Sequence, residues 1–319
     1  MATQVRILPA AQMKFFRNTA DVEDLIRKTI ATYGSAPEHN YYWYEYCGGI
    51  AEFEDANTDN QKNVFVLWPD GSGLLTKENS KEFFIFSEPL APLEKRIAIL
   101  NEYLREVLES GKAEKVTLEL ETAEHLELVR SLAEELKALP VSYILTTPIM
   151  DLAKFDPELP GKKFKYIRKA EHKFKREHEI EITDAKQTPK KELHALIDRW
   201  KEERKGKDRA VETEYRNIIE GEWRGTDHAH VFMIDGVVRG LNAGWRIPNK
   251  NRYYAAIGVH DYSLPDFGTL LYLEDLRWMK RQGHREADMG GGEETLTEFK
   301  NKFGPSRWYK TEIFTIVKK

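Results

Sequence analysis

The first candidate for chemistry is a histidine that follows a strand-like segment. His260 and Asp261 come directly after the apolar run at residues 253–259, which has the composition of a β-strand. An imidazole at a strand end can act as a general base, because its ordinary pKa of about 6.5 lies close to neutrality. The alternative for His260 is a partly exposed structural residue, which is the commoner role of a lone histidine in this position.

A second candidate is a dense run of positive charge at residues 162–176. Its basic residues are Lys162, Lys163, Lys165, Arg168, Lys169, Lys173, Lys175 and Arg176. Only Glu171 opposes them, and Phe164, Ile167 and Phe174 fall on the opposite side of the expected helix. Such a face could hold tRNA phosphates or an anionic lipid surface, and the alternative is an ordinary solvated face. We expect polyanion contacts from Lys165, Arg168, Lys169, Lys173 and Arg176, with a second basic cluster at residues 199–209 beside them.

Three consecutive glycines, Gly290 to Gly292, join an expected strand to an expected helix. A phosphate-binding loop is one interpretation, but no Lys-Ser or Lys-Thr pair follows them as a Walker motif requires. Thr295 and Glu298 have the spacing of a capping box. A structural turn is therefore favoured over a phosphate cradle.

Metal and thiol chemistry have little support in the sequence. His228 and His230 would lie on one side of a strand, but no cysteine and no evident third ligand accompany them. Cys47 is the only cysteine, so a cysteine-rich zinc site is excluded. Its neighbours resemble the start of a strand, which favours a small core residue over a nucleophile. We expect no bound metal and no bound cofactor.

The composition indicates a folded protein of about two domains. The chain has 319 residues, 41% of them hydrophobic, and 49 Lys and Arg against 53 Asp and Glu give a net charge of −4. This balance fits neither a disordered chain nor a generic polyanion binder. No apolar stretch reaches the roughly 20 residues of a membrane span, and the N-terminus lacks a signal-peptide pattern. A cytoplasmic location is the expectation.

Periodicity and turn residues divide the chain into two α/β units, residues 1–152 and 153–319, with a linker at residues 156–163. In the first unit we expect helices at residues 18–34, 92–111 and 123–139, and strands at residues 47–53, 64–68, 115–120 and 141–151. A short apolar run from Phe83 should lead into helix 92–111. The strands at 47–53 and 64–68 should form an antiparallel pair. The second unit should hold the basic helix, helices at 188–206 and 212–223, three antiparallel strands with a hairpin at Asp235-Gly236, and helix 268–282. Strand 285–289, helix 295–303 and strand 308–317 should complete it.

This order of elements, and several local sequences, resemble a known superfamily. The segment AAIGVHDYSLPDFGTLLYL is similar to the central strand, phosphate-binding turn and long helix of the GCN5-related N-acyltransferase (GNAT) superfamily. PLAP around Pro89, LPGKKFKYIRKAEHKFKREH from Leu159 and MGGGEETLTEFKNKFGP at the end resemble a family of tandem proteins. That family includes the catalytic C-terminal domain of phosphatidylglycerol lysyltransferase and is similar in fold to the FemX aminoacyl-tRNA-dependent ligases. The resemblance implies an α/β protein of tandem GNAT-like (acyl-CoA N-acyltransferase) units, each a mixed, largely antiparallel sheet flanked by helices.

The turn before the long helix departs from the superfamily pattern. Gly268 keeps the last glycine, but Asp266 stands in place of the first glycine and Ser263 in place of the basic or Gln residue. A carboxylate there would repel the phosphates that a helix N-terminus otherwise attracts. The alternative is that the turn at Asp266 simply caps a core helix.

The resemblance also implies roles for particular residues. Backbone groups of Ile257, Gly258 and Val259, together with Gly268, Thr269 and Leu270, would bind the donor and polarise its carbonyl. Lys300 aligns with a tyrosine that protonates the leaving thiolate in many members. A lysine there can stabilise the more basic ribose oxygen of an aminoacyl-tRNA ester. The alternative for Lys300 is an ordinary surface lysine.

The sequence thus predicts an acyl- or aminoacyltransferase whose second unit is catalytic and whose first unit is structural or shapes the substrate site. The co-substrate is acyl-coenzyme A or aminoacyl-tRNA, and the acceptor is an amine or hydroxyl. A small-molecule or peptide amine is favoured over a membrane phospholipid, with peripheral membrane contact left open. The alternative is a catalytically silent GNAT-fold module that binds RNA or another polyanion through the basic helix.

Overall fold

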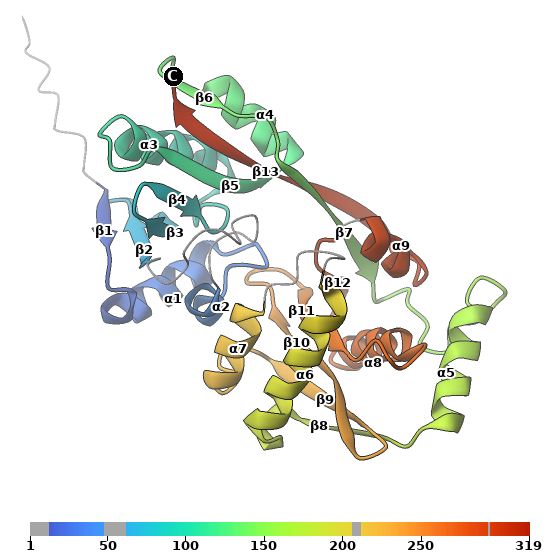
Figure 1. Cartoon of the computed structure of the whole chain (residues 1–319). Coiled ribbons are helices and arrows are strands. Elements are labelled where there is room, and N and C mark those ends of the chain that lie inside the picture. Colours follow the sequence, from blue (N-terminus) through green and yellow to red (C-terminus); the bar gives the residue numbers. More distant parts are fainter. Residues whose placement is uncertain (1–12, 48–61, 206–211, 293) are drawn as a thin grey trace, which may run out of the picture.

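The computed structural model describes residues 13–47, 62–205, 212–292 and 294–319 (Figure 1). Its first half contains β1 (Lys14–Phe16), α1 (Glu23–Tyr33), α2 (Tyr41–Tyr46), β2 (Lys62–Leu67), β3 (Gly73–Asn79), β4 (Glu82–Ile85), α3 (Arg96–Leu108), β5 (Lys115–Glu121), α4 (Thr122–Ser131), β6 (Leu136–Ala138) and β7 (Tyr143–Asp151). Its second half contains α5 (Lys165–Glu177), β8 (Ile180–Asp184), α6 (Lys190–Arg204), α7 (Thr213–Glu220), β9 (His228–Ile234), β10 (Val237–Arg246), β11 (Arg252–His260), α8 (Phe267–Arg281), β12 (Glu286–Asp288), α9 (Glu294–Asn301) and β13 (Arg307–Lys318).

One continuous sheet runs through both halves of the molecule. The strand order is β1-β2-β3-β4-β5-β13-β7-β12-β11-β10-β9-β8, and β6 pairs separately with β13. Within each half a single parallel pair, β4 with β5 and β11 with β12, is joined by a crossover helix, α3 or α8. The two halves therefore repeat one arrangement of four antiparallel strands followed by a parallel one.

The halves exchange strands at the centre of the sheet. β13, the last strand of the chain, pairs with β5 of the first half, while β7 of the first half pairs with β12 of the second. β7 and β13 also pair with each other. Phe314 of β13 lies in the core of the first half, and Met150 of β7 lies in the core of the second. The predicted boundary between residues 152 and 153 stays a prediction, since the sheet crosses it without a break.

Alternation along the strands places helices on both faces of each half. In β2, Val64 and Val66 pack in the core beneath α3, whereas Phe65 packs on the opposite face with α1 and α2. In the second half, Ile257 and Val259 of β11 contact the core under α6 and α7. The other face is covered by α8, α5 and α9. The tandem α/β expectation is thus met by a sheet covered on both faces.

The structure corrects the expected strand at residues 47–53. Cys47 ends helix α2, which begins after Asn40, whose side chain accepts the N–H groups of Tyr42 and Trp43. The rest of that expected strand lies outside the described residues. The expected antiparallel pairing with residues 64–68 therefore also lies outside the described residues, and β2 itself pairs with β1 and β3.

The helix expected at residues 123–139 is also too long. α4 ends at Ser131, and residues 136–138 form β6 instead, because they pair with the edge of β13. Strands β1, β3 and β8 and helix α2 are not among the elements that the sequence predicts. The remaining expected elements are present, shifted at their ends by a few residues. No helix within the described residues is long and apolar enough to cross a membrane.

The exchanged strand should dominate the stability of the whole protein. Phe314 is fully buried in β13, so Phe314→Ala should lower the free energy of unfolding by about 3–5 kcal/mol. Urea unfolding at constant temperature measures this change. The matched truncation Leu93→Ala, at a side chain that is 69% exposed, should change it by less than about 0.5 kcal/mol. A loss below about 1 kcal/mol for Phe314→Ala would contradict the role given to β13.

Candidate functional site

A cavity of about 280 Å³ lies where the two halves meet. Its lining includes residues of β5, β7, β11, β12 and β13, so the exchanged strands contribute to its wall. A loop at residues 35–38 and a segment at residues 86–88 of the first half line it as well. The charged side chains around it are Glu38, Glu88, Glu119, Glu121, Asp288, Lys250 and Arg252. Carboxylates thus outnumber cations, five to two.

The loop that carries Glu38 is fixed by hydrogen bonds from both halves. His39 Nδ1 accepts the N–H groups of Ser35 and Ala36 at 2.7 and 3.0 Å, and its Nε2 donates to the carbonyl of Glu88. Burial lowers the pKa of His39 to about 4, which keeps it in the neutral form that this pattern requires. From the second half, Trp245 Nε1 donates to the Pro37 carbonyl at 2.8 Å. The loop is therefore held rigidly over the sheet.

Three carboxyl groups in the cavity have raised pKa values because burial disfavours their charged forms. Burial raises the pKa of Glu38 well above its usual range, and the negative charges of Glu119 and Asp288 add to this effect. Burial likewise raises the pKa of Glu119 and of Asp288. The Thr311 hydroxyl donates to Glu119, and the Tyr309 hydroxyl donates to Asp288 at 2.8 Å.

Glu38 differs from these neighbours. Glu88 is paired with Arg96, and Asp288 also accepts the N–H of Gly290 at 3.1 Å. The Glu38 carboxylate has no hydrogen-bond donor from another residue within the described part of the chain. A group that carries a positive charge and N–H donors would complete this cavity.

Lys300 is buried rather than on the surface, and it lies behind the cavity wall without lining the cavity itself. Its residue is 6% exposed, and Nζ donates to the carbonyl oxygens of Met289 and Gly290 at 2.7 and 2.8 Å. Gly291, which follows Gly290 in the chain, lines the cavity. Burial lowers the pKa of Lys300 to about 8, opposed by the charge of Asp288. An ammonium has three N–H groups, so one remains for a ligand.

Lys300 also sits where β11 and β12 separate. The two strands pair only from Arg252 to Tyr254, and β11 continues to His260 without β12 beside it. Gly290 has Lys300 Nζ, the Ala255 carbonyl and the Tyr254 ring around it. The predicted donor-binding residues Ile257 and Val259 are buried in this diverging strand, and Gly258 is exposed. Their role stays a prediction.

The start of α8 is occupied by protein groups. A Cβ on Gly268 would lie 2.7 Å from His260 Nε2, so this glycine makes room for the imidazole. Burial lowers the pKa of His260 to about 4. The N–H groups of Thr269 and Leu270 both donate to the Asp266 carbonyl, at 3.0 and 3.3 Å. His260 is thus packed against the first turn of α8, and its proposed role as a base stays untested.

The glycine run at residues 290–292 and the pair His228 and His230 interact with neighbouring protein groups. Gly292 forms a backbone bridge with Thr146, and Gly290 has φ 74°, which glycine adopts freely. α9 begins at Glu294, one residue before the expected Thr295 start.

The histidine pair is held by local contacts. His228 is hydrogen-bonded to Asp275 and Tyr253, and burial lowers the pKa of the neighbouring His230 to about 4. Within the described residues no group of three or more His, Cys, Asp or Glu side chains is arranged to hold a metal ion.

The basic helix α5 separates its charged side from its buried side. Lys165, Lys169, Lys173 and Arg176 are exposed, whereas Arg168 donates to the carbonyls of Leu159 and Gly161. Ile167 and Phe174 are buried, and Phe174 stacks on Phe267 of α8. The second basic cluster is largely occupied: Arg199 binds the Val238 carbonyl and Lys201 pairs with Glu212. Lys207 and Arg209 lie outside the described residues.

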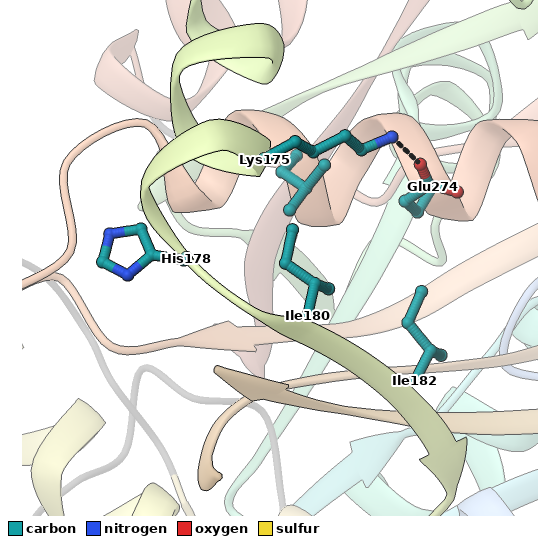
Figure 2. Close-up of a pocket in the computed structure, with 6 residues that line it drawn as sticks. Lys175, His178, Ile180, Ile182 and Glu274 are labelled. Carbon is teal, nitrogen blue, oxygen red and sulfur yellow. Dashed lines mark hydrogen bonds and ion pairs between the residues drawn. The ribbon is translucent and has the colours of Figure 1, made fainter. Parts of the chain in front are cut away.

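A second hollow, of about 370 Å³, lies between α5, β8 and α8 (Figure 2). Ile180 and Ile182 from β8 and Leu270 from α8 line it. Lys175 points across it to Glu274 at 3.3 Å, so its two opposite charges satisfy each other. Its lining thus combines three apolar side chains with His178 and this ion pair, in which each charge has a partner.

The cavity was not anticipated from the sequence. Its residues come as short runs and single positions from many segments of both halves, and none forms a recognisable motif. The sequence points only to Lys300, through the family resemblance, and to the run of glycines at residues 290–292. The other lining residues come together through the exchange of strands between the halves, and no short sequence pattern encodes that exchange.

Comparison with known proteins identifies the family and the fold. The family model described as phosphatidylglycerol lysyltransferase, C-terminal, matches residues 58–260. No functionally curated protein matches the chain. The structure is similar to the C-terminal domain of a putative lysylphosphatidylglycerol synthetase from Agrobacterium fabrum, with TM-score 0.64 and 14% identity over 92% of each chain.

Two further structures share the fold at low identity. FemX matches with TM-score 0.55 and 13% identity over 86% of this chain and 94% of that one. A tandem GNAT protein from the clavulanic acid biosynthesis pathway matches with TM-score 0.52 and 12% identity over 96% and 98%. These likenesses confirm the expected tandem GNAT-like fold. Since the family model spans well over half of the chain, the protein belongs to the family of the C-terminal domain of phosphatidylglycerol lysyltransferase.

Proposed function

We propose that this protein transfers an aminoacyl group from an aminoacyl-tRNA ester to an acceptor bound in the cavity between its halves. The observation that carries the proposal is Lys300, a buried ammonium that binds the carbonyls of Met289 and Gly290, next to Gly291 in the wall of a carboxylate-rich cavity. Family membership and the likeness in fold to FemX support aminoacyl transfer over other acyl transfers. The names of the relatives make a lysyl group the first candidate to test.

The start of α8 supports an ester donor over a coenzyme A thioester. A pyrophosphate needs free N–H groups and close backbone approach at a helix N-terminus. Here the N–H groups of Phe267 and Thr269 already donate to the carbonyls of Leu264 and Asp266, the His260 ring packs against Gly268, and the Asp266 carboxylate adds negative charge. Each of these features disfavours a pyrophosphate at this position.

Lys300 would stabilise the oxygen that leaves when the ester is broken. The ribose oxygen develops negative charge in the transition state, and a buried cation aimed at it acts more strongly than it would in water. Its two carbonyl contacts hold Nζ in place, so little reorganisation is needed. The carboxylates Glu119 and Asp288 would bind the ammonium groups of the substrates.

We propose further that the exposed face of α5 binds tRNA phosphates. Lys163, next to the N-terminal end of α5, reaches Gly304 just beyond α9, the helix that carries Lys300. Positive charge therefore continues from the Lys300 region along α5 through Lys165, Lys169 and Lys173. A membrane-bound helix needs a free apolar face, but the apolar face of α5 is buried against α8. RNA phosphates suit this surface better than a lipid bilayer.

Replacing Lys300 should slow the transfer step. Lys300→Met removes the charge while keeping the stem, and kcat should fall by about 100-fold or more with little change in KM. Single-turnover transfer from charged tRNA measures the effect. Lys302→Met, at an exposed lysine two residues away, is the control and should retain full activity. Unfolding curves must confirm that both variants are folded.

The same residue should set the alkaline limb of the pH profile. Burial lowers the pKa of Lys300 to about 8, so the protonated form is lost as the pH rises through 8 and the wild-type rate should fall there. In Lys300→Arg the guanidinium stays charged, so any residual rate should not fall between pH 7 and about 9.5. An identical decline in both proteins would contradict the role of Lys300.

Binding of tRNA should depend on salt through α5. The triple variant Lys165→Gln, Lys169→Gln and Lys173→Gln should reduce the slope of log K against log salt by about 2–3. Fluorescence anisotropy with labelled tRNA between about 50 and 200 mM salt measures this slope. The range is wide enough to resolve a change of about one in the slope. The control removes three exposed lysines of the first half, Lys14, Lys28 and Lys137. Equal slopes for the two variants would contradict the proposal. So would a triple variant that still binds tRNA like wild type but no longer binds anionic vesicles.

A further inference from the structure

Two carboxylates of the cavity, Glu38 and Glu121, have no hydrogen-bond or ionic partner within the described part of the chain, and Glu38 is the less exposed of the two. Its loop is anchored through His39 and through Trp245, so the side chain is held at the cavity from the first half. Glu88, Glu119 and Asp288 each have a donor or cationic partner. Glu38 receives no donor from another residue within the described part of the chain. A carboxylate held in this way is available to exchange a proton with a ligand.

We propose that the acceptor is a primary amine and that Glu38 takes the proton from it before the amine attacks the ester. The inference rests on the transfer activity proposed above. It assigns a catalytic residue to the first half, which the sequence presented only as structural or substrate-shaping.

The charge around the cavity supports an amine. The carboxylates that face Glu38 are Glu119 and Glu121 on β5, Asp288 on β12 and Glu88 in the segment before α3. An ammonium entering this cavity is attracted by all of them, whereas a phosphate group would meet net repulsion.

The remaining groups that face Glu38 do not neutralise it. Lys250 lies in the turn before β11 and is exposed, and Arg252 is paired with Glu286. Tyr254 and Tyr309 have raised pKa values because they are buried, so they stay neutral phenols. Burial and the nearby carboxylates raise the pKa of Glu38, which brings it closer to that of an amine and makes it a stronger base.

The step balances as follows. The ammonium gives one proton to Glu38, and the neutral nitrogen attacks the ester carbonyl carbon. A C–N bond forms, the C–O bond to the ribose breaks, and the departing oxygen takes a proton from Lys300. The second proton leaving the nitrogen restores Lys300, and Glu38 returns its proton to solvent. The products are an amide, a free ribose hydroxyl and one released proton.

The test is a single-turnover transfer assay with the full chain, lysyl-tRNA and alanyl-tRNA, between pH 5.5 and about 9. Acceptors are a simple diamine, a lysine-bearing peptide, and phosphatidylglycerol vesicles. Wild type should form amide with an amine acceptor. Glu38→Gln, which keeps shape and loses the base, should lower kcat by about 100-fold and remove the acidic limb of the profile. Glu38→Asp should recover part of the rate.

The control is Glu94→Gln, an exposed carboxylate of the first half, which should behave as wild type. If wild type transfers but Glu38→Gln matches it at every pH, or only its KM rises, Glu38 is not the base and the inference is overturned while the proposed function stands. Transfer to phosphatidylglycerol and to no amine would overturn the amine acceptor. If wild type transfers nothing to any acceptor, the proposed function and this inference fail together.

Discussion

The exchange of β7 and β13 between the halves is the constraint on which the rest of the structure depends. Each half needs a strand from the other to complete its sheet beyond β5 or β12. The exchanged strands bury Phe314 and Met150 in the opposite cores. Separating the halves would expose these cores and leave two strand edges unpaired, so the two units are bound into one structure.

The candidate site follows from this exchange. Thr311 and Tyr309 of β13 come beside Glu119 of β5 and Asp288 of β12 only because β13 reaches back into the first half. Glu38 lies on a loop of the first half that is anchored by a hydrogen bond from Trp245 of the second half. A cavity built in this way combines groups from both halves at fixed separations. Catalysis by positioning requires that kind of rigidity.

Burial gives the site its chemistry. The same low-polarity surroundings lower the pKa of Lys300 and raise the pKa values of Glu38, Glu119 and Asp288. The acid and base forms of these groups are therefore closer in free energy than they would be in water, which favours proton transfer near neutral pH. On the surface the same residues would be permanently charged and poor at exchanging protons.

Much of the fold could be predicted from the sequence, because helices α3, α6 and α8 and the hairpin at Asp235-Gly236 follow from local periodicity and turn residues. The strand order could not, since pairing of β13 with β5 joins residues nearly two hundred positions apart. The strand start expected at Cys47 is instead the end of α2, a helix that the side chain of Asn40 caps. Lys300 was identified by resemblance, while Glu38 has no local signal and depends entirely on tertiary structure.

The central claim is that the cavity between the halves holds the reacting ester. A crystal structure with a stable analogue, an adenosine whose 3′ position carries an aminoacyl amide in place of the ester, tests it most directly. The ribose should contact Lys300, and the amino group should lie among Glu119, Asp288 and Glu38. An analogue bound instead in the hollow beside β8, or at the start of α8, with the cavity empty, would contradict the claim.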